Sequence, residues 1–154
     1  MGKFYFRKGE TMAAVDNWEI ELIGKGSHGS MPELGIDPIV CGSSLVMALQ
    51  TIVSRNVSPW QASVVSVGAF LSGNAGNVVP QNAILRLSIR NMDAELRENV
   101  LKKIRLITKA QAEAFGCQFE IREGIAGTVL VNTPKHTEWA ARVARDVFGE
   151  TKVD

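Results

Sequence analysis

The residue of this chain best suited to chemistry is His28, one of two histidines among 154 residues. It lies in the segment 24–32, where three glycines and a proline surround it. Glycine permits backbone conformations that other residues avoid, so this composition is typical of an exposed turn. A strand pattern precedes the segment and a helix pattern follows it. We therefore expect the chain to present His28 to a molecule outside it; a loop histidine without a role is the alternative.

The spacing Gly24-x-Gly26-x-x-Gly29 also matches the phosphate-binding turn of dinucleotide-binding proteins. That turn requires a helix that begins at the third glycine, so that the helix N-terminus faces a pyrophosphate. A proline and a further glycine follow here instead, and a helix can begin only near Asp37. We therefore reject a nucleotide site at this segment.

The other residues with chemical potential are few. Asn77 lies in a second glycine-rich loop, residues 73–80, where it is either a turn residue or a functional amide. His136 is expected to be exposed and without a role. Cys41 and Cys117 lie in apolar patterns, which predicts reduced core thiols in a cytoplasmic protein. Because no cysteine or histidine shows ligand spacing, we expect no metal site made by this chain alone.

Composition excludes several classes of partner. The formal net charge of +1 provides no field that would attract nucleic acid or an anionic membrane. No apolar run approaches the length that a membrane span requires. The length allows one domain with a substantial core. We therefore expect a globular domain that binds neither nucleic acid nor membrane.

Hydrophobic periodicity predicts four strands and three helices. Strands are expected at residues 18–23, 63–72, 81–91 and 117–122, and helices at residues 39–54, 93–115 and 133–148. Asp37 and Asp93 are expected to cap the first two helices. Apolar residues on both faces of the second strand predict a central strand covered on each side. Residues 124–131 are expected to be irregular.

The order of these elements is β-α-β-β-α-β, followed by an extra helix. This is the ferredoxin-like arrangement of an α+β fold, a four-stranded antiparallel sheet with two helices on one face. Alternation in the third strand predicts that four side chains face the core, those of Ala83, Leu85, Leu87 and Ile89. The architecture by itself indicates no function.

Several short segments carry a family resemblance. They are GKGSHGSMP (24–32), GIDPI (35–39), LQTIVSR (49–55), GNVVP (76–80), LSIR (87–90) and VNTP (131–134). In this order they resemble the lid or dimerisation domain of the aminoacylase and hippurate-hydrolase amidohydrolases, which are carboxypeptidase-G-type metallopeptidases. The resemblance covers nearly the whole chain. It implies a catalytic-domain stub at residues 1–15, a lid and dimerisation domain at 16–124, and a linker and helix returning to the catalytic domain at 125–154.

The resemblance also implies an activity for the parent protein, the hydrolysis of an N-acyl amino acid or related amide. Two divalent metal ions, expected to be zinc, would be held by the catalytic domain. This chain lacks the family's His-x-Asp motif and Glu-Glu pair. Since the metal activates water and polarises the carbonyl, we expect the chain alone to bind no cofactor and to be inactive. The expected partners are a second copy, in a homodimer, and the chain's own catalytic domain.

Three residues receive roles from the resemblance. His28 of one subunit would reach the partner's metal site and hold the scissile carbonyl oxygen, a contact worth about 3–4 kcal/mol. Asn77 would donate its amide to the same substrate. Arg90 would hold a substrate carboxylate, for which a planar guanidinium is suited.

Two other functions remain as alternatives. Ferredoxin-like domains also bind RNA, through aromatic and basic residues on the sheet. The expected solvent-exposed face offers no aromatic pair, which argues against RNA; its polar residues are Glu19, Glu21, Arg86 and Ser88. A free-standing small-ligand-binding or regulatory module is the other alternative, and it would require a ligand that raises the melting temperature of the chain without any catalytic domain.

Overall fold

The structure of the protein, a computed structural model, describes residues 2–154. This part of the chain is α+β, with three α-helices and antiparallel sheets. The strands are β1 (Gly9–Met12), β2 (Ala14–Ile23), β3 (Ser27–His28), β4 (Ser63–Ser72), β5 (Val78–Val79), β6 (Asn82–Asn91), β7 (Gln118–Gly127) and β8 (Leu130–Asn132). The helices are α1 (Pro38–Asn56), α2 (Ala94–Phe115) and α3 (Pro134–Phe148), with short 3-10 turns at Pro32–Leu34 and Glu150–Lys152.

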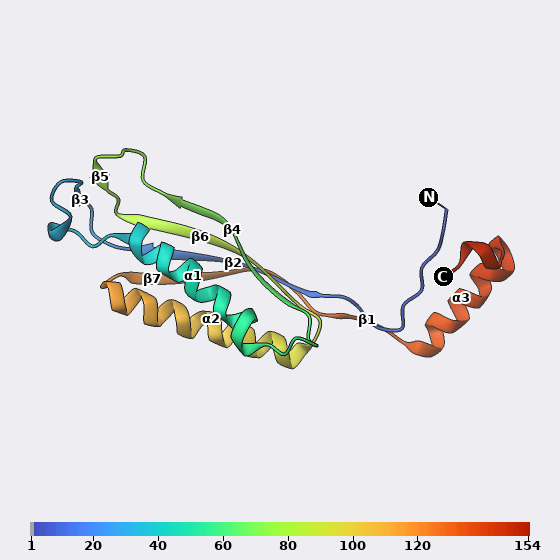
Figure 1. The fold of residues 1–154 in the computed structure, drawn as a ribbon. Coiled ribbons are helices and arrows are strands. Elements are labelled where there is room, and N and C mark those ends of the chain that lie inside the picture. Colours follow the sequence, from blue (N-terminus) through green and yellow to red (C-terminus); the bar gives the residue numbers. More distant parts are fainter. Residues whose placement is uncertain (1) are drawn as a thin grey trace.

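The largest element is a four-stranded sheet in the order β4-β6-β2-β7, in which every neighbouring pair is antiparallel. Helices α1 and α2 cover one face of it and leave the other face open (Figure 1). The four β6 side chains predicted to face the core are buried, which confirms that prediction. They pack with residues of β2 and both helices, among them Ile20, Leu22, Leu45, Leu49 and Ile104.

The two helices over the sheet begin where the sequence predicts. The Asp37 carboxylate accepts hydrogen bonds from the backbone N–H of Ile39 at 2.8 Å and of Val40 at 3.3 Å. The Asp93 carboxylate accepts from the N–H of Leu96 at 2.7 Å. A side-chain oxygen at this position satisfies backbone donors that have no partner within the helix. Both predicted caps are therefore confirmed.

The position of β4 differs from the prediction. β4 is an edge strand, paired with β6 on one side only among the described residues. Val64 and Leu71 are each 48% exposed. The central-strand prediction was wrong because an apolar run on both faces does not distinguish a strand covered within its own chain from an edge strand that offers apolar surface outward.

Helix α1 also corrects an expectation, since by length and composition it is apolar enough to cross a membrane. It is the one such helix in residues 2–154. The fold accounts for these apolar residues, because one side of the helix is fully buried in the main core. The residues on that side are Cys41, Leu45, Leu49 and Ile52.

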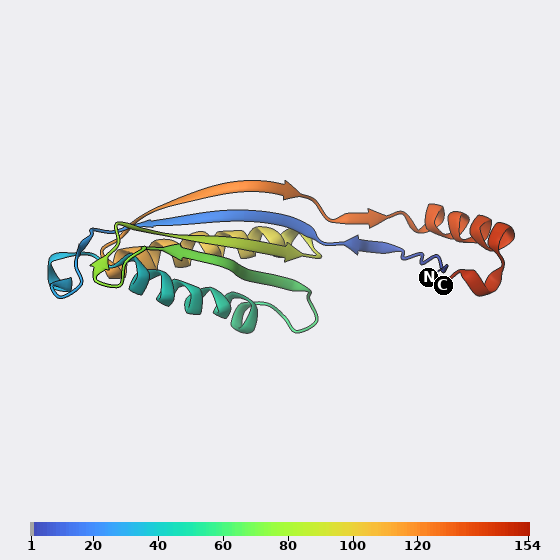
Figure 2. The same ribbon diagram turned by 90° about the horizontal axis from the view of Figure 1, so that it is seen from above.

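Beyond the sheet, β1 and β8 pair as a two-stranded ribbon that leads to α3 (Figure 2). Gly9 lies opposite Asn132 in this ribbon. The expectation that residues 124–131 are irregular was wrong, because β7 continues to Gly127 and β8 begins at Leu130. The ribbon separates α3 from the main sheet.

Helix α3 packs against the N-terminal segment in a small cluster of its own. Ala141, Ala144 and Val153 are buried there against Phe6. Phe4 stacks on Phe148 with ring centroids 4.7 Å apart. Three other large apolar residues of α3 lie on another side of the helix and are exposed; they are Trp139, Val143 and Val147.

Candidate functional site

The loop that carries His28 is held by backbone hydrogen bonds at close range. The N–H of Lys25 donates to the carbonyl of Ile36 at 2.9 Å, and the N–H of Ile36 donates back at 2.9 Å. A Cβ on Gly24 would lie 2.2 Å from the Ile36 carbonyl oxygen. In the described structure, no glycine of residues 24–35 has a positive φ. Glycine is therefore needed here for the close approach of two backbones, not for the unusual conformation that the sequence suggested.

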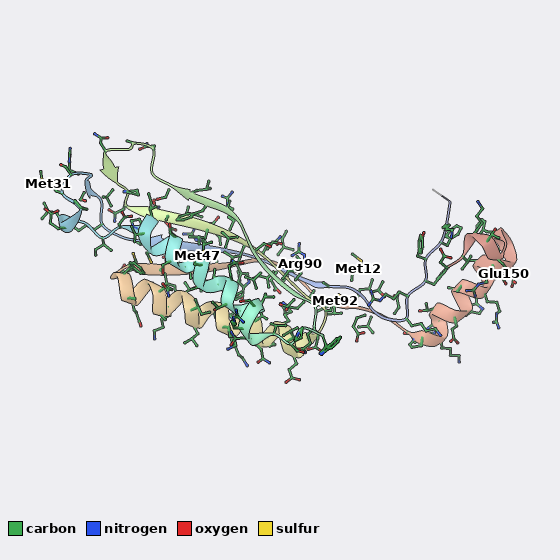
Figure 3. The ribbon with its side chains drawn as sticks, viewed as in Figure 1. Met12, Met31, Met47, Arg90, Met92 and Glu150 are labelled. Atoms are coloured by element: carbon green, nitrogen blue, oxygen red, sulfur yellow. The ribbon has the colours of Figure 1, made fainter. Side chains whose placement is uncertain are left out.

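Two residues singled out from the sequence, His28 and Asn77, are brought together. β3 pairs with β5 so that His28 lies opposite Val78. The next backbone N–H along, that of Gly29, donates to the Asn77 carbonyl at 2.7 Å. Both side chains are exposed, as expected for His28. The two glycine-rich loops thus form one surface at the outer end of the sheet, and Met31, labelled in Figure 3, lies at this tip.

The imidazole of His28 is held on one side only. The backbone N–H of Ser30 donates to Nδ1 at 3.1 Å, and the Ser30 hydroxyl lies 2.7 Å from the same nitrogen. Within residues 2–154, Nε2 has no hydrogen-bond partner. Sequence reasoning assigned nothing to Ser30, and the sequence signal that would have found it is a serine two residues after a loop histidine.

Asn77 contacts the His28 loop through its backbone carbonyl, and its side chain makes no contact of this kind within the described residues. Its carbonyl accepts from Gly29, whereas its amide group makes no hydrogen bond to the rest of the described chain. Asn77 lies in a turn, as one of the two sequence alternatives has it, and its φ is not positive. The exposed amide can donate two hydrogen bonds and accept through its oxygen.

Arg90 lies elsewhere. It is the ninth of the ten residues of β6, roughly 25 Å along the strand from the end that carries the loops. Figure 3 places it near Met12 and Met92, where the ribbon leaves the sheet. Its Nη1 donates to the Ile89 carbonyl at 3.0 Å and lies 3.5 Å from Oδ1 of Asn17. One copy of the chain therefore does not unite Arg90 with His28 and Asn77.

The open face of the sheet carries an ion-pair network. Glu19 pairs with Arg86 and with Arg122, each at 3.0 Å, and Arg122 also pairs with Glu21 at 2.6 Å. The hydrogen bond from Arg86 holds the pKa of Glu19 below its usual value. Hydrogen bonds from Asn82 and then Arg122 lower the pKa of Glu21. A shallow groove of about 510 Å³ runs over this face, but because its charges are paired with one another we assign it no ligand.

Residues 2–154 contain no group of three or more histidine, cysteine, aspartate or glutamate side chains that could hold a metal ion. His136 is exposed on the first turn of α3. Cys41 and Cys117 are buried and free. Burial raises the pKa of Cys41 to about 12 and also raises that of Cys117. Neither thiol is therefore prepared to act as a nucleophile or ligand.

Comparison with known proteins shows where this architecture recurs. A family model described as the peptidase dimerisation domain matches residues 15–116. A hippurate hydrolase of Campylobacter jejuni is 43% identical over 148 residues, which are 96% of this chain and 39% of that protein. An N-acyl-L-amino acid amidohydrolase of Geobacillus stearothermophilus is 37% identical over 148 residues, 94% of this chain and 40% of that protein. The chain thus spans about two fifths of the length of these relatives.

Solved structures with the same fold also match nearly the whole of this chain but only part of their own length. A protein of methicillin-resistant Staphylococcus aureus matches with a TM-score of 0.85 and 30% identity, over 94% of this chain and 39% of that one. A Bacillus subtilis protein, described as a dinuclear metal-binding peptidase of the M20 family, matches with a TM-score of 0.71 and 25% identity. That match covers 95% of this chain and 35% of the other.

Proposed function

Because the chain belongs to the peptidase dimerisation domain family, we propose that it is the lid and dimerisation domain of a metal-dependent amidohydrolase. The proposed substrate is an N-acyl amino acid or a related amide, which the names of the hippurate hydrolase and N-acyl-L-amino acid amidohydrolase relatives support. Since the chain spans about two fifths of these relatives, the proposal places catalysis in the remaining length. The chain alone is then without amidase activity.

The observation that carries the proposal is the place of His28. β2 is ten residues long, so roughly 30 Å separates the loops at the tip from the ribbon at the other end. A catalytic domain attached through the ribbon would lie far from His28 of the same subunit. His28 therefore fits a catalytic site on the partner subunit, whereas Arg90, beside the ribbon, fits a site on its own subunit, where it would hold a substrate carboxylate.

At the partner's site, His28 would donate an imidazole N–H to the scissile carbonyl oxygen. Asn77, which precedes the residue that lies opposite His28, would donate a hydrogen bond from its side-chain amide to the same substrate. A donor placed where negative charge develops in the transition state contributes about 3–4 kcal/mol. Because the free nitrogen of His28 points away from Ser30, the ring is able to make this contact without breaking its own hydrogen bonds.

The edge strand β4 supports a homodimer. Its ten residues, SVVSVGAFLS, include no charged residue and no proline, the usual features that prevent an exposed edge from pairing. Val64 and Leu71 are exposed on it, and Val40 and Met47 are exposed on the neighbouring helix α1. Two β4 strands that pair antiparallel across a two-fold axis would extend the sheet from one subunit into the other.

The arrangement of strands and helices supports the ferredoxin-like description of the fold. The six elements β2, α1, β4, β6, α2 and β7 follow the β-α-β-β-α-β order. In this arrangement the first and third strands are central, and the sheet order β4-β6-β2-β7 has that property. We propose that residues 16–124 are this domain.

The ribbon and α3 support the proposal that residues 1–15, of which Met1 lies outside the described residues, and residues 125–154 pack on a catalytic domain. Trp139, Val143 and Val147 form an exposed apolar stripe along α3, and Leu130 and Val131 are exposed on the ribbon. Contiguous exposed apolar surface of this kind is typical of a contact site with another domain or protein. The catalytic domain would hold two divalent ions, which the description of the Bacillus subtilis protein as a dinuclear metal-binding peptidase supports, and zinc is the proposed metal. The buried free thiols support a reducing, cytoplasmic location.

The test of the proposed role is His28→Ala in the amidohydrolase that contains this chain. Loss of one transition-state donor is expected to lower kcat by about 10²–10³-fold. His136→Ala is the matched control, because it removes the other histidine from a helix far from the tip. The melting temperature should be the same for both variants. If kcat of His28→Ala equals that of the wild type, the proposed role of His28 is wrong.

The proposed dimer is tested on the chain alone by sedimentation velocity. Val64→Glu with Leu71→Glu places like charges along the β4 edge, which is expected to weaken self-association by about tenfold or more. Leu106→Glu is the matched control, since Leu106 is also exposed and apolar but lies on α2. A chain that is monomeric at every concentration, or an equal effect of the control, would contradict the β4 interface.

A further inference from the structure

The hydrogen bonds around His28 specify which ring nitrogen carries the hydrogen. A backbone N–H can only donate, so the Ser30 N–H that lies 3.1 Å from Nδ1 requires this nitrogen to be the acceptor. In a neutral imidazole one nitrogen accepts and the other donates. The hydrogen of neutral His28 is therefore assigned to Nε2, the nitrogen on the open side of the ring.

The Ser30 N–H is itself fixed in place. The residue before it, Gly29, donates its N–H to the Asn77 carbonyl at 2.7 Å. The residue after it, Met31, donates its N–H to the His28 carbonyl at 2.8 Å. With both neighbours tied, the Ser30 N–H is directed at the ring by the backbone of the turn. The Ser30 hydroxyl, 2.7 Å from Nδ1, is placed to donate to the same nitrogen.

We propose that Ser30 is a positioning residue that holds His28 as the Nε2–H tautomer, so that the outward nitrogen is a hydrogen-bond donor. One consequence rests on the proposed function, namely that Nε2–H donates a hydrogen bond to the carbonyl oxygen of the substrate. The assignment of the tautomer depends on the turn alone. A ring in the other tautomer would present a lone pair to the carbonyl oxygen and would repel it.

The direct test is nuclear magnetic resonance on the ¹⁵N-labelled chain, at a pH of about 8.5, above the range in which imidazole ionises. We expect the Nε2 of His28 to show a bonded hydrogen and Nδ1 to show none. We also expect a scalar coupling across the hydrogen bond between the Ser30 amide nitrogen and Nδ1. His136→Ala removes the only other imidazole from the spectrum, and Ser30→Ala should keep the coupling because it keeps the backbone N–H.

A hydrogen on Nδ1 of His28, or the absence of that coupling in the wild type, would overturn the proposal. Either result leaves the catalytic role of His28 to be judged by the His28→Ala variant, so the two failures are distinguishable. In the full amidohydrolase, two further variants report which nitrogen is used. The amide nitrogen of His28→Gln reaches the position of Nε2, and that of His28→Asn reaches the position of Nδ1. We expect kcat/KM to be about tenfold higher for His28→Gln than for His28→Asn, and the reverse order would contradict the assignment.

Discussion

The buried ion pair between Asp16 and Arg97 joins β2 to the first turns of α2, near the end of the sheet from which the ribbon leaves. Arg97 donates from Nη2 and Nε to the two carboxylate oxygens, at 2.6 and 2.7 Å. Asp16 is 2% exposed, whereas the Arg97 side chain is 22% exposed. The hydrogen bond to Asp16 raises the pKa of Arg97, so the guanidinium stays charged. If one partner is removed, water can therefore reach the remaining Arg97 side chain more easily than the remaining Asp16 carboxylate.

This difference predicts unequal losses of stability. Arg97→Ala leaves a buried carboxylate without a partner, which is expected to cost about 3 kcal/mol. Asp16→Ala leaves a guanidinium that still reaches water and Glu98, 3.2 Å away, and the expected cost is about 1–2 kcal/mol. In the double variant neither charge remains, so the cost should be smaller than the sum of the two single costs by about 1–2 kcal/mol.

The assay is urea unfolding of the isolated chain, followed by circular dichroism. The free energies of unfolding of the wild type, the two single variants and the double variant form one cycle. Arg97→Lys is a control that keeps the positive charge but loses the paired hydrogen bonds, and it should fall between wild type and Arg97→Ala. Equal losses below about 0.5 kcal/mol for both single variants, or strict additivity in the double variant, would refute this reasoning.

Three further predictions follow from the described contacts. The pKa values of Glu19 and Glu21 are lowered from 4.5 in the folded chain, so the two carboxylates stabilise the fold above pH 4.5 and lose this effect as the pH falls below it. The urea midpoint should therefore fall on acidification, and it should fall less in a Glu19→Gln, Glu21→Gln double variant. Gly29→Ala places a Cβ 2.9 Å from the facing backbone of the second loop, and a melting temperature lower by a few degrees, equivalent to about 1–3 kcal/mol, is expected. Cys41 and Cys117 should not react with a thiol reagent in the native chain and should both react in urea, since burial raises both pKa values; rapid native labelling of either would contradict this.

The elements with strong local signals could be predicted from the sequence. Asp37 and Asp93 are followed by helices because a carboxylate can satisfy the first backbone donors, and this depends on neighbours in the sequence alone. The alternation in β6 likewise follows from a local period of two. The edge position of β4 could not be predicted in this way. It depends on which strands pair, and the apolar pattern of β4 is shared by buried and edge strands.

The residues of the candidate site could be named from the sequence, but their positions relative to one another could not. His28 and Asn77 are 49 positions apart, and a pairing of only two residues in each strand brings them together. Such a short pairing leaves no periodic pattern in the sequence. The same limit applies to Arg90, whose distance from the His28 loop follows from the length of β6. The role proposed for Ser30 depends on the hydrogen bonds of the turn, which the sequence does not show.

The central claim is that His28 serves the catalytic site of the partner subunit, and mixed dimers of the proposed full-length amidohydrolase test it most directly. One subunit would carry His28→Ala with an intact catalytic domain, and the other would carry an intact His28 with a catalytic domain disabled at its metal site. Each variant alone should form an inactive homodimer. If His28 acts in the partner's site, mixing the two should restore one working site in each mixed dimer. Mixed dimers that form but remain inactive would show that His28 does not act across the interface.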